Sequence, residues 1–321
     1  MTALADRIAA VAIERVFTGA AAVARLHPRA RKQRRALDIV HDVPYLPGRH
    51  RAHLLDIYRP TRHAGPWPVV VYIHGGSFRI LSKDTHWIPG VQFARAGYLT
   101  FVVNYRLSPA HRFPAAFEDV TAAIEWVMKS APFHGGDTSR LVLAGESAGA
   151  NLALAWSIAA TYERSEPYAR RVYNSGIVPA AIAPACGILQ VSSPERFRDE
   201  TDAPSGRLAE LIYGRIAGVG AAYLPDDHPD EPSLADPLWV LEEETRPPER
   251  PFPAVTAGVG DRDPIRADTE RLDKALSKLG VDHAARVYEG RHAFQMLVWQ
   301  EAAKAYWSDT IAFLNERVRR E

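Results

Sequence analysis

The chain has 321 residues, of which 47% are hydrophobic and 24% charged, and its formal net charge at pH 7 is +1. This composition is typical of a globular protein with one large core, and a charge so close to zero argues against binding to nucleic acid or anionic membranes through an overall field. The single cysteine, Cys186, excludes internal disulfides, and no apolar run reaches the roughly 18 residues that suggest a membrane span.

The first part of the chain, roughly residues 3–38, is expected to be helical. Charged residues interrupt its apolar runs at helical spacing, which favours an uncleaved amphipathic helix over a signal peptide and therefore a cytoplasmic location. The segment ends in a basic stretch between Arg29 and Arg35. We interpret that stretch as a solvated helix face, with a docking surface for an acidic partner as the alternative.

From about residue 53 onward, short apolar runs alternate with amphipathic stretches. The runs that we expect to form strands are 54–58, 68–73, 98–104, 141–144, 252–259 and 284–288. The stretches that we expect to form helices are 117–129, 148–160, 266–279 and 302–318. Strands that alternate with helices predict an α/β fold with a mostly parallel, doubly wound sheet and right-handed crossovers.

Residues 191–245 interrupt this alternation. The interval is rich in Pro, Asp and Glu and contains one expected helix, residues 206–217. We interpret it as an insertion between sheet elements and not as a second domain. The chain is therefore expected to form a single domain, residues 1–321, in which about 1–40 and about 191–245 together build a cap over one edge of the sheet.

A serine stands between an expected strand and an expected helix, in Gly145-Glu146-Ser147-Ala148-Gly149. A tight strand-to-helix elbow needs small residues on both sides of the serine, and it lifts the hydroxyl above the strand end at the N-terminus of a helix. The five-residue pattern alone is weak, but its position between a strand and a helix strengthens it. We predict that Ser147 is a nucleophile.

A glycine-rich loop, His74-Gly75-Gly76-Ser77-Phe78, directly follows the expected strand 68–73. Acyl transfer passes through a tetrahedral oxyanion that needs preorganised N–H donors. A glycine-rich loop at a strand end exposes such amides, although the same pattern also fits an ordinary βα turn. Together with the elbow, the loop predicts an oxyanion hole formed by the amides of Gly76, Ser77 and Ala148.

An acid and a histidine should follow the serine along the chain. Catalytic groups in open α/β sheets lie outside the carboxyl ends of the strands. This rule favours Asp263 as the acid and His292 as the base, because each of them follows an expected strand.

The same rule separates the other candidates. Asp282 and His283 precede an expected strand and would lie at the opposite edge of the sheet. Asp261 and Asp268 are close to Asp263 in the sequence and remain alternatives to it.

Most other histidines show no metal-ligand spacing, and the sequence has no phosphate-binding loop or dinucleotide fingerprint. We therefore expect no metal and no cofactor. His86, in Asp84-Thr85-His86-Trp87, lies close in sequence to the glycine-rich loop and is a candidate for the wall of the pocket.

The sequence resembles the hormone-sensitive-lipase-like esterases, an α/β-hydrolase group of bacterial carboxylesterases and acetyl esterases. The resemblance covers about residues 53–320. Besides the elbow and the glycine-rich loop, it rests on residues 105–116 (Tyr-Arg-Leu-Ser-Pro-Ala-His-Arg-Phe-Pro-Ala-Ala), 263–266 (Asp-Pro-Ile-Arg) and 290–294 (Gly-Arg-His-Ala-Phe).

The resemblance implies an α/β-hydrolase fold, with a mostly parallel eight-stranded sheet flanked by helices and a helical cap. It assigns Ser147 as nucleophile, Asp263 as acid and His292 as base, in agreement with the strand-end argument. It also implies a small acyl ester as substrate and no cofactor. Neither a nucleic-acid partner nor an integral membrane segment is expected, and a homodimer is left open.

The sequence departs from the family pattern at several positions. Ser77 stands where the family has the third glycine of the oxyanion loop, and Ala110 where an acidic residue is expected. Glu146 replaces the usual elbow aspartate, and Ala150 replaces the final elbow glycine. Because the amide at position 77 is retained, we expect these departures to affect substrate preference more than catalysis.

The bulky Phe78 and Trp87 near the oxyanion loop are expected to bind substrate and to favour short to medium acyl chains. Together these features predict a serine carboxylesterase that works through an acyl-enzyme. The same triad would serve an amidase, a lactonase or an acyltransferase. A non-catalytic binding protein and a lipase that acts at an oil–water interface are the remaining alternatives.

Overall fold

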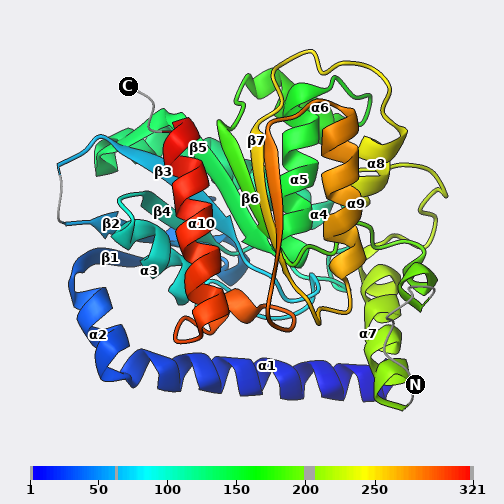
Figure 1. Ribbon diagram of the computed structural model, residues 1–321, viewed down its shortest axis with the longest axis horizontal. Coiled ribbons are helices and arrows are strands. Elements are labelled where there is room, and N and C mark those ends of the chain that lie inside the picture. The colour runs from blue at the N-terminus through cyan, green and yellow to red at the C-terminus, as the bar shows by residue number, and fades with distance from the viewer. Residues whose placement is uncertain (1–2, 62–63, 199–206, 319–321) are drawn as a thin grey trace.

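A sheet of eight strands forms the centre of the computed structural model, which describes residues 3–61, 64–198 and 207–318 (Figure 1). The strands are β1 (Leu37–Pro44), β2 (Leu54–Pro60), β3 (Trp67–Ile73), β4 (Leu99–Val103), β5 (Gly136–Glu146), β6 (Ala181–Ala185), β7 (Ala254–Gly260) and β8 (His283–Tyr288). Their order in the sheet is β1-β2-β4-β3-β5-β6-β7-β8. β1 and β2 pair antiparallel, as do β2 and β4, and all other neighbours pair in parallel. The predicted mostly parallel, eight-stranded sheet is confirmed.

Helices cover both faces of this sheet (Figure 1). They are α1 (Ala3–Leu26), α2 (Pro28–Arg35), α3 (Trp87–Arg95), α4 (Ala115–Ser130), α5 (Ala148–Thr161), α6 (Pro167–Ser175), α7 (Arg207–Tyr223), α8 (Pro237–Glu243), α9 (Arg266–Lys278) and α10 (Glu301–Val318). Side chains alternate along β3, so that Val69 and Val71 belong to the core with α4, α5 and α9, whereas Val70 and Tyr72 belong to the core with α3 and α10. No helix in the described ranges is both long and apolar enough to cross a bilayer.

Two strands of the sheet are not predicted from the sequence, nor are the short helices α3, α6 and α8. β6 reads Ala-Ile-Ala-Pro-Ala, which combines weak strand formers with Pro184, and it is held in place by β5 and β7 on its two sides. β1 is an edge strand whose register shifts between Val40 and Val43. It begins at Leu37, so the helical N-terminal region ends at Arg35, before the limit of about 40 that was expected for the cap.

α1 runs along the edge of the sheet at which the parallel strands end (Figure 1). The indole of Trp87, at the start of α3, donates a hydrogen bond to Ala21 O of α1 at 3.3 Å. α7 approaches the same edge, where the amide of Phe113 donates to Tyr223 O at 2.8 Å. These contacts place an N-terminal helix and a helix of the insertion over the carboxyl edge of the sheet.

Candidate active site

Ser147 occupies a strained elbow between β5 and α5. Its φ and ψ are 50° and −115°, a combination that residues other than glycine rarely adopt. The flanking glycines leave no room for side chains: a Cβ on Gly145 would lie 2.5 Å from Gly149 C, and a Cβ on Gly149 would lie 2.0 Å from Ile73 O. The amide of Ser147 donates to Ala185 O at 2.9 Å. The small neighbours therefore allow β3, β5 and α5 to approach closely around the serine.

Four neighbouring parallel strands bring the other candidate residues to the same edge. The last residue of β5 pairs with the last residue of β6, and the last residue of β7 pairs with the last residue of β8. Ser147, Cys186, Asp263 and His292 follow these four strands in turn. Because the carboxyl ends of parallel strands lie together, these four residues all follow strands at the same edge of the sheet.

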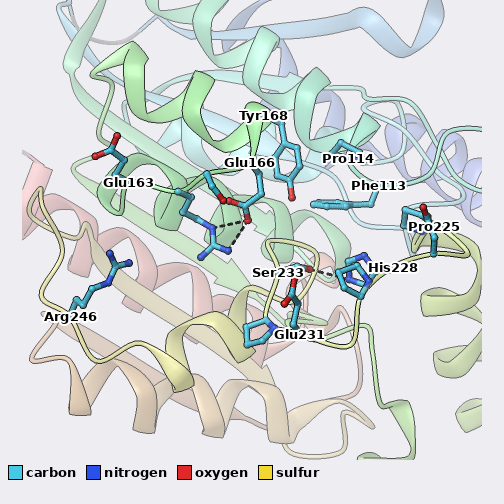
Figure 2. Close-up of a pocket in the computed structure, with 15 residues that line it drawn as sticks. Phe113, Pro114, Glu163, Glu166, Tyr168, Pro225, His228, Glu231, Ser233 and Arg246 are labelled. Atoms are coloured by element: carbon cyan, nitrogen blue, oxygen red, sulfur yellow. Dashed lines mark hydrogen bonds and ion pairs between the residues drawn. The ribbon is translucent and has the colours of Figure 1, made fainter.

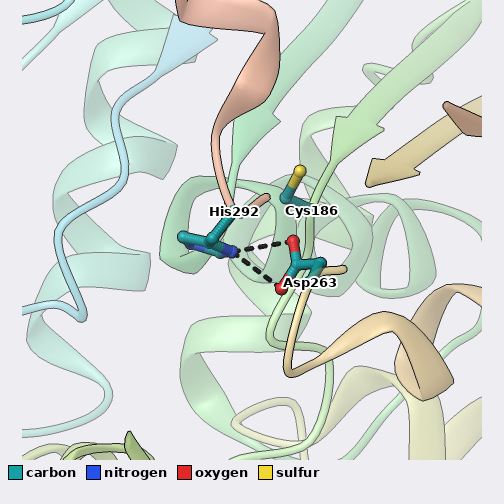
Figure 3. A group of neighbouring side chains, drawn as sticks. All are labelled: Cys186, Asp263 and His292. Carbon is teal, nitrogen blue, oxygen red and sulfur yellow. Dashed lines mark hydrogen bonds and ion pairs between the residues drawn. The ribbon is translucent and has the colours of Figure 1, made fainter. Parts of the chain in front are cut away.

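His292 and Asp263 form a hydrogen-bonded pair (Figure 3). Nδ1 of His292 lies 2.9 Å from Oδ2 and 3.1 Å from Oδ1 of Asp263. The Asp263 side chain is fully buried, whereas that of His292 is 38% exposed. Burial lowers the pKa of His292, but the charge and hydrogen bond of Asp263, with a further contribution from Glu146, outweigh it and raise that pKa to about 9. Nδ1 is thereby held as a donor to the carboxylate, and Nε2 remains for proton exchange.

The structure separates Asp263 from its two sequence alternatives. Oδ1 of Asp261 accepts a hydrogen bond from the amide of Gly290 at 2.7 Å, so this carboxylate braces the loop that carries the histidine. Asp268 is buried and lies 2.8 Å from the guanidinium of Arg196. Of the three carboxylates, Asp263 is the one bonded to the histidine ring.

The predicted oxyanion amides lie on the loop after β3 and at the start of α5. Gly76 and Ser77 have φ of 118° and 56°, so both residues are in the left-handed region. Gly76 suits this conformation, and a Cβ there would lie 2.1 Å from Ile80 O. Neither amide donates to another protein group within the described chain. Ala148 is the first residue of α5, and its amide has no partner within the helix.

Phe78 and Trp87 are both buried. Phe78 has no exposed surface, and its ring stacks on Tyr223 of α7 with a centroid distance of 3.7 Å. Trp87 is 4% exposed and bonds to Ala21 of α1. The prediction that these two side chains bind substrate finds no support in these positions. Each instead joins a helix at the carboxyl edge to the body of the protein.

Cys186 lies beside the histidine–aspartate pair (Figure 3). One ligand atom from each of Cys186, Asp263 and His292 lies within 4.8 Å of the other two, which is the spacing of a metal site. Burial raises the pKa of the Cys186 thiol well above its ordinary value, whereas a metal ligand would be a thiolate. An ion there would also replace the proton on Nδ1 that bonds to Asp263. The donor set therefore suits a hydrogen-bonded pair better than a bound ion.

Lys83 anchors the loop between β3 and α3, although no sequence motif marks it. Its side chain is 2% exposed, and Nζ lies 2.8 Å from Asp42, 2.8 Å from Asp56 and 3.0 Å from Asp84. Burial lowers the pKa of Lys83, but these carboxylates outweigh it and raise that pKa above its ordinary value. The amide of Lys83 also donates to Asn104 Oδ1 at 2.7 Å. The loop that carries the predicted oxyanion amides is thus tied to β1 and β2.

A groove of about 640 Å³ lies elsewhere, where the starts of α4 and α6 meet the segment after α7 (Figure 2). Its wall includes the rings of Phe113 and Tyr168, and its charged groups include the ion pair of Arg164 with Glu166 at 2.8 Å. None of the predicted catalytic residues is among the described residues that line it. The predicted catalytic residues therefore belong to the carboxyl edge of the sheet and not to the lining of this groove.

Residues 70–296 match the family described as α/β hydrolase fold. Carboxylesterase NlhH of Mycobacterium tuberculosis is 40% identical over 97 residues, which is 30% of each chain. Versiconal hemiacetal acetate esterase of Dothistroma septosporum is 26% identical over 245 residues, 75% of this chain and 70% of the relative. For NlhH and the esterases LipQ and LipI, the matched segment spans 30%, 37% and 27% of the relative's length.

A solved structure of an esterase from Pyrobaculum calidifontis has the same fold. It superposes with a TM-score of 0.74 and 24% sequence identity, over 96% of this chain and 92% of its own. The family match covers more than half of the chain, and the sheet order and the strand-to-helix elbow agree with it. The chain belongs to the α/β-hydrolase fold family, and the relatives to which it is similar include carboxylesterases.

Proposed function

We propose that the protein is a serine carboxylesterase that cleaves short- to medium-chain acyl esters through an acyl-enzyme. The observation that carries the proposal is the hydrogen-bonded pair of His292 and Asp263, on the loops that neighbour the strained elbow of Ser147. A histidine held by a carboxylate and a serine held above a strand end are the two parts that such a mechanism needs. The esterase names of the relatives support the same class of reaction.

In the proposed reaction, Nε2 of His292 takes the proton of Ser147 while Oγ attacks the ester carbonyl. Asp263 keeps Nδ1 protonated and stabilises the imidazolium that forms. The amides of the oxyanion loop and of Ala148 receive the negative charge that develops on the carbonyl oxygen. His292 then protonates the leaving alcohol and the acyl group stays on Oγ. A water molecule activated by the same Nε2 releases the acid and restores the serine.

Covalent labelling tests this proposal. A fluorophosphonate probe should label the wild-type protein at Ser147, and the Ser147→Ala variant should take up no label. The same variant should lose ester turnover on the order of 10⁴-fold, because the members of a triad act as a unit. Absence of labelling in the folded wild-type protein would favour a non-catalytic binding protein instead.

The bond that is cleaved distinguishes the proposal from its nearest alternatives. An amidase, a lactonase or an acyltransferase would use the same serine and histidine, since pocket shape and water access select the substrate. A panel of linear esters, lactones and amides of matched acyl length, assayed with and without an added alcohol acceptor, separates these reactions. The proposal requires the linear esters to be the best substrates and water to be the main acceptor.

An interfacial lipase is the second candidate, favoured by one feature of α1. This helix runs along the carboxyl edge of the sheet (Figure 1), and the exposed side chains on it include the apolar Val16, Phe17, Val23 and Leu26. An apolar helix face of this kind suits contact with a lipid surface. Rates on tributyrin below and above its solubility limit decide between the two, because a lipase shows a sharp rise in rate at that limit and an esterase does not.

The cytoplasmic location stays a prediction, which cell fractionation tests. The homodimer that the sequence left open is tested by light scattering.

A further inference from the structure

A second histidine–carboxylate pair is buried next to the proposed triad. Glu146, the residue before Ser147, is 5% exposed. Its Oε1 lies 2.9 Å from Nε2 of His86, the residue that precedes α3. Its Oε2 accepts a hydrogen bond from the side-chain amide of Gln295 at 2.8 Å. His86 and Gln295 are both buried as well.

The Glu146 carboxylate contacts three segments that the proposed reaction uses. Glu146 directly precedes Ser147 in the chain, and its carboxylate contacts His86 at the end of the β3–α3 loop, the loop that carries the predicted oxyanion amides. Gln295 belongs to η4 (Phe294–Met296), three residues after His292. Gly75 of the oxyanion loop also packs against it, so closely that a Cβ on Gly75 would lie 2.9 Å from Oε1. One side chain therefore links the elbow, the oxyanion loop and the histidine loop.

The groups around Glu146 are arranged for an ionised carboxylate. Both of its oxygens accept hydrogen bonds, and the amide of Gln295 is oriented by a second contact, since its Oε1 lies 3.6 Å from the donor Sγ of Cys186. Burial raises the pKa of Glu146, but the charge and hydrogen bond of His86 and the charge of His292 outweigh it and hold that pKa below its ordinary value.

We propose that Glu146 is a positioning residue of the catalytic centre: it holds the three segments in register and its negative charge favours the protonated form of His292 during the reaction. The inference rests on the proposed esterase function and deepens it. It also gives a reason for glutamate at this elbow position, because the same carboxylate reaches both His86 and Gln295.

Other titratable groups also surround Glu146 and His292, and their protonation states limit which group could produce the acidic limb of a pH–rate profile. Asp263 is bonded to His292 and contributes a second negative charge. The thiol of Cys186 and three buried tyrosines stay protonated, because burial raises the pKa of each of them, and His74 stays neutral, because burial lowers its pKa to about 3. The tyrosines are Tyr72, Tyr105 and Tyr306. His86 is the other histidine that faces Glu146.

The test is the pH dependence of kcat/KM for the full chain on one acyl ester, with active sites counted by phosphonate titration. Glu146→Gln keeps the shape and removes the charge. It should move the acidic limb to lower pH by roughly half to one unit and lower kcat about tenfold, with little change in KM. Glu146→Asp retains the charge on a shorter side chain, so its limb should stay at the wild-type pH while kcat falls. His86→Gln should leave the acidic limb at the wild-type pH. This result would show that the limb reports the protonation of His292 and not of His86.

Asp236→Asn is the matched control. Asp236 is fully buried, and its Oδ1 accepts a hydrogen bond from Ser192 N at 3.0 Å within the insertion. Loss of this buried charge should leave the limb in place. The inference is overturned if Glu146→Gln has the wild-type limb and a kcat within about twofold of it. If that variant does not fold, Gln295→Met decides: the inference requires a lower kcat at unchanged KM, and wild-type kcat overturns it. Failure of the esterase proposal is recognised separately, by an unlabelled Ser147.

Discussion

Phe78 and Tyr223 lie face to face, with ring centroids 3.7 Å apart and planes inclined by 11°. Phe78 directly follows Ser77 of the oxyanion loop, and Tyr223 is the last residue of α7. Neither ring has exposed surface. The insertion that the sequence marks as an interruption therefore supports, through this ring pair, the loop that presents the proposed oxyanion amides.

Tyr223→Ala should damage both stability and activity. Removing a buried ring leaves a cavity, which costs about 3–5 kcal/mol of unfolding free energy, and the oxyanion loop loses its support. Tyr223→Phe is the control, because the hydroxyl of Tyr223 is buried and has no hydrogen-bond partner in the described protein. Urea unfolding and initial rates should show that variant close to the wild type. Equal damage by both substitutions would show that the hydroxyl matters more than the ring contact.

The pH dependence of the rate should follow His292. Its Nε2 must be unprotonated to accept the serine proton, and the pKa of the ring is about 9. We therefore expect kcat/KM to rise through the neutral range and to level off near that value. The pKa of His292 in the folded protein is above its ordinary value of 6.5. The pair of His292 and Asp263 therefore contributes its full stabilisation of the fold below pH 6.5, and this contribution is lost as the pH rises through about 9. A rate plateau reached already at neutral pH would contradict this coupling.

Three aspartate variants test the assignment of the acid. Asp263→Asn should reduce kcat on the order of 10⁴-fold, because the amide favours the wrong tautomer of the imidazole. Asp261→Asn should cost much less, since this exposed carboxylate contacts the Gly290 amide and not the ring. Asp268→Asn should mainly lower stability, because it disturbs the buried pair with Arg196. Parallel measurement of kcat and urea unfolding checks the order, and a larger loss of kcat at Asp261 would refute the assignment.

Lys83→Met should lower stability because it leaves Asp56 buried without its cation. Breaking a buried ion pair from one side costs roughly 3–5 kcal/mol. Asp84→Asn is the matched control: this carboxylate contacts the same ammonium but is 44% exposed, so its removal should have a small effect.

Stability should also fall in acid because of Asp56. Burial raises the pKa of Asp56, but its hydrogen bonds to His41 and Lys83 and the charge of Lys83 outweigh burial and lower that pKa. The contribution of Asp56 to the free energy of unfolding is fully present above the ordinary aspartate pKa, and it is lost as the pH falls through the pKa of Asp56 in the folded protein. Urea unfolding in acid and at neutral pH measures both effects.

Two neighbouring positions after Ser147, Gly149 and Ala150, should differ in their tolerance of substitution. Gly149→Ala places a Cβ 2.0 Å from Ile73 O, a backbone atom that cannot move without shifting β3, so we expect loss of folding or of activity. Ala150→Gly adopts the residue that the family usually has there, and it should remain active at a stability cost of about 1 kcal/mol for a helical glycine. Circular dichroism and ester turnover of the two variants make the comparison. An active, stable Gly149→Ala protein would contradict the close approach of β3 and α5.

Local patterns in the sequence account for most of the fold. The apolar runs that became β3, β4, β7 and β8 and the periodic stretches that became α4, α5, α9 and α10 carry their signal within a single element. β6 does not, because an alanine-rich strand with Pro184 owes its conformation to the two strands that flank it. The edge strand β1 follows a helical pattern without a clear boundary, and its pairing with β2 decides where it begins.

The candidate site divides in the same way. The elbow around Ser147, the glycine-rich loop and the order of serine, acid and histidine are properties of the sequence by itself, because tight turns and strand ends demand particular residue types at fixed spacing. The choice of Asp263 among three nearby aspartates needed the tertiary structure, since it depends on which carboxylate meets a ring 29 residues away. The burial of Phe78, the ion cluster of Lys83 and the links of Glu146 to His86 and Gln295 also came from the folded chain. Contacts between residues far apart in sequence leave no periodic or local signal, so only packing decided them.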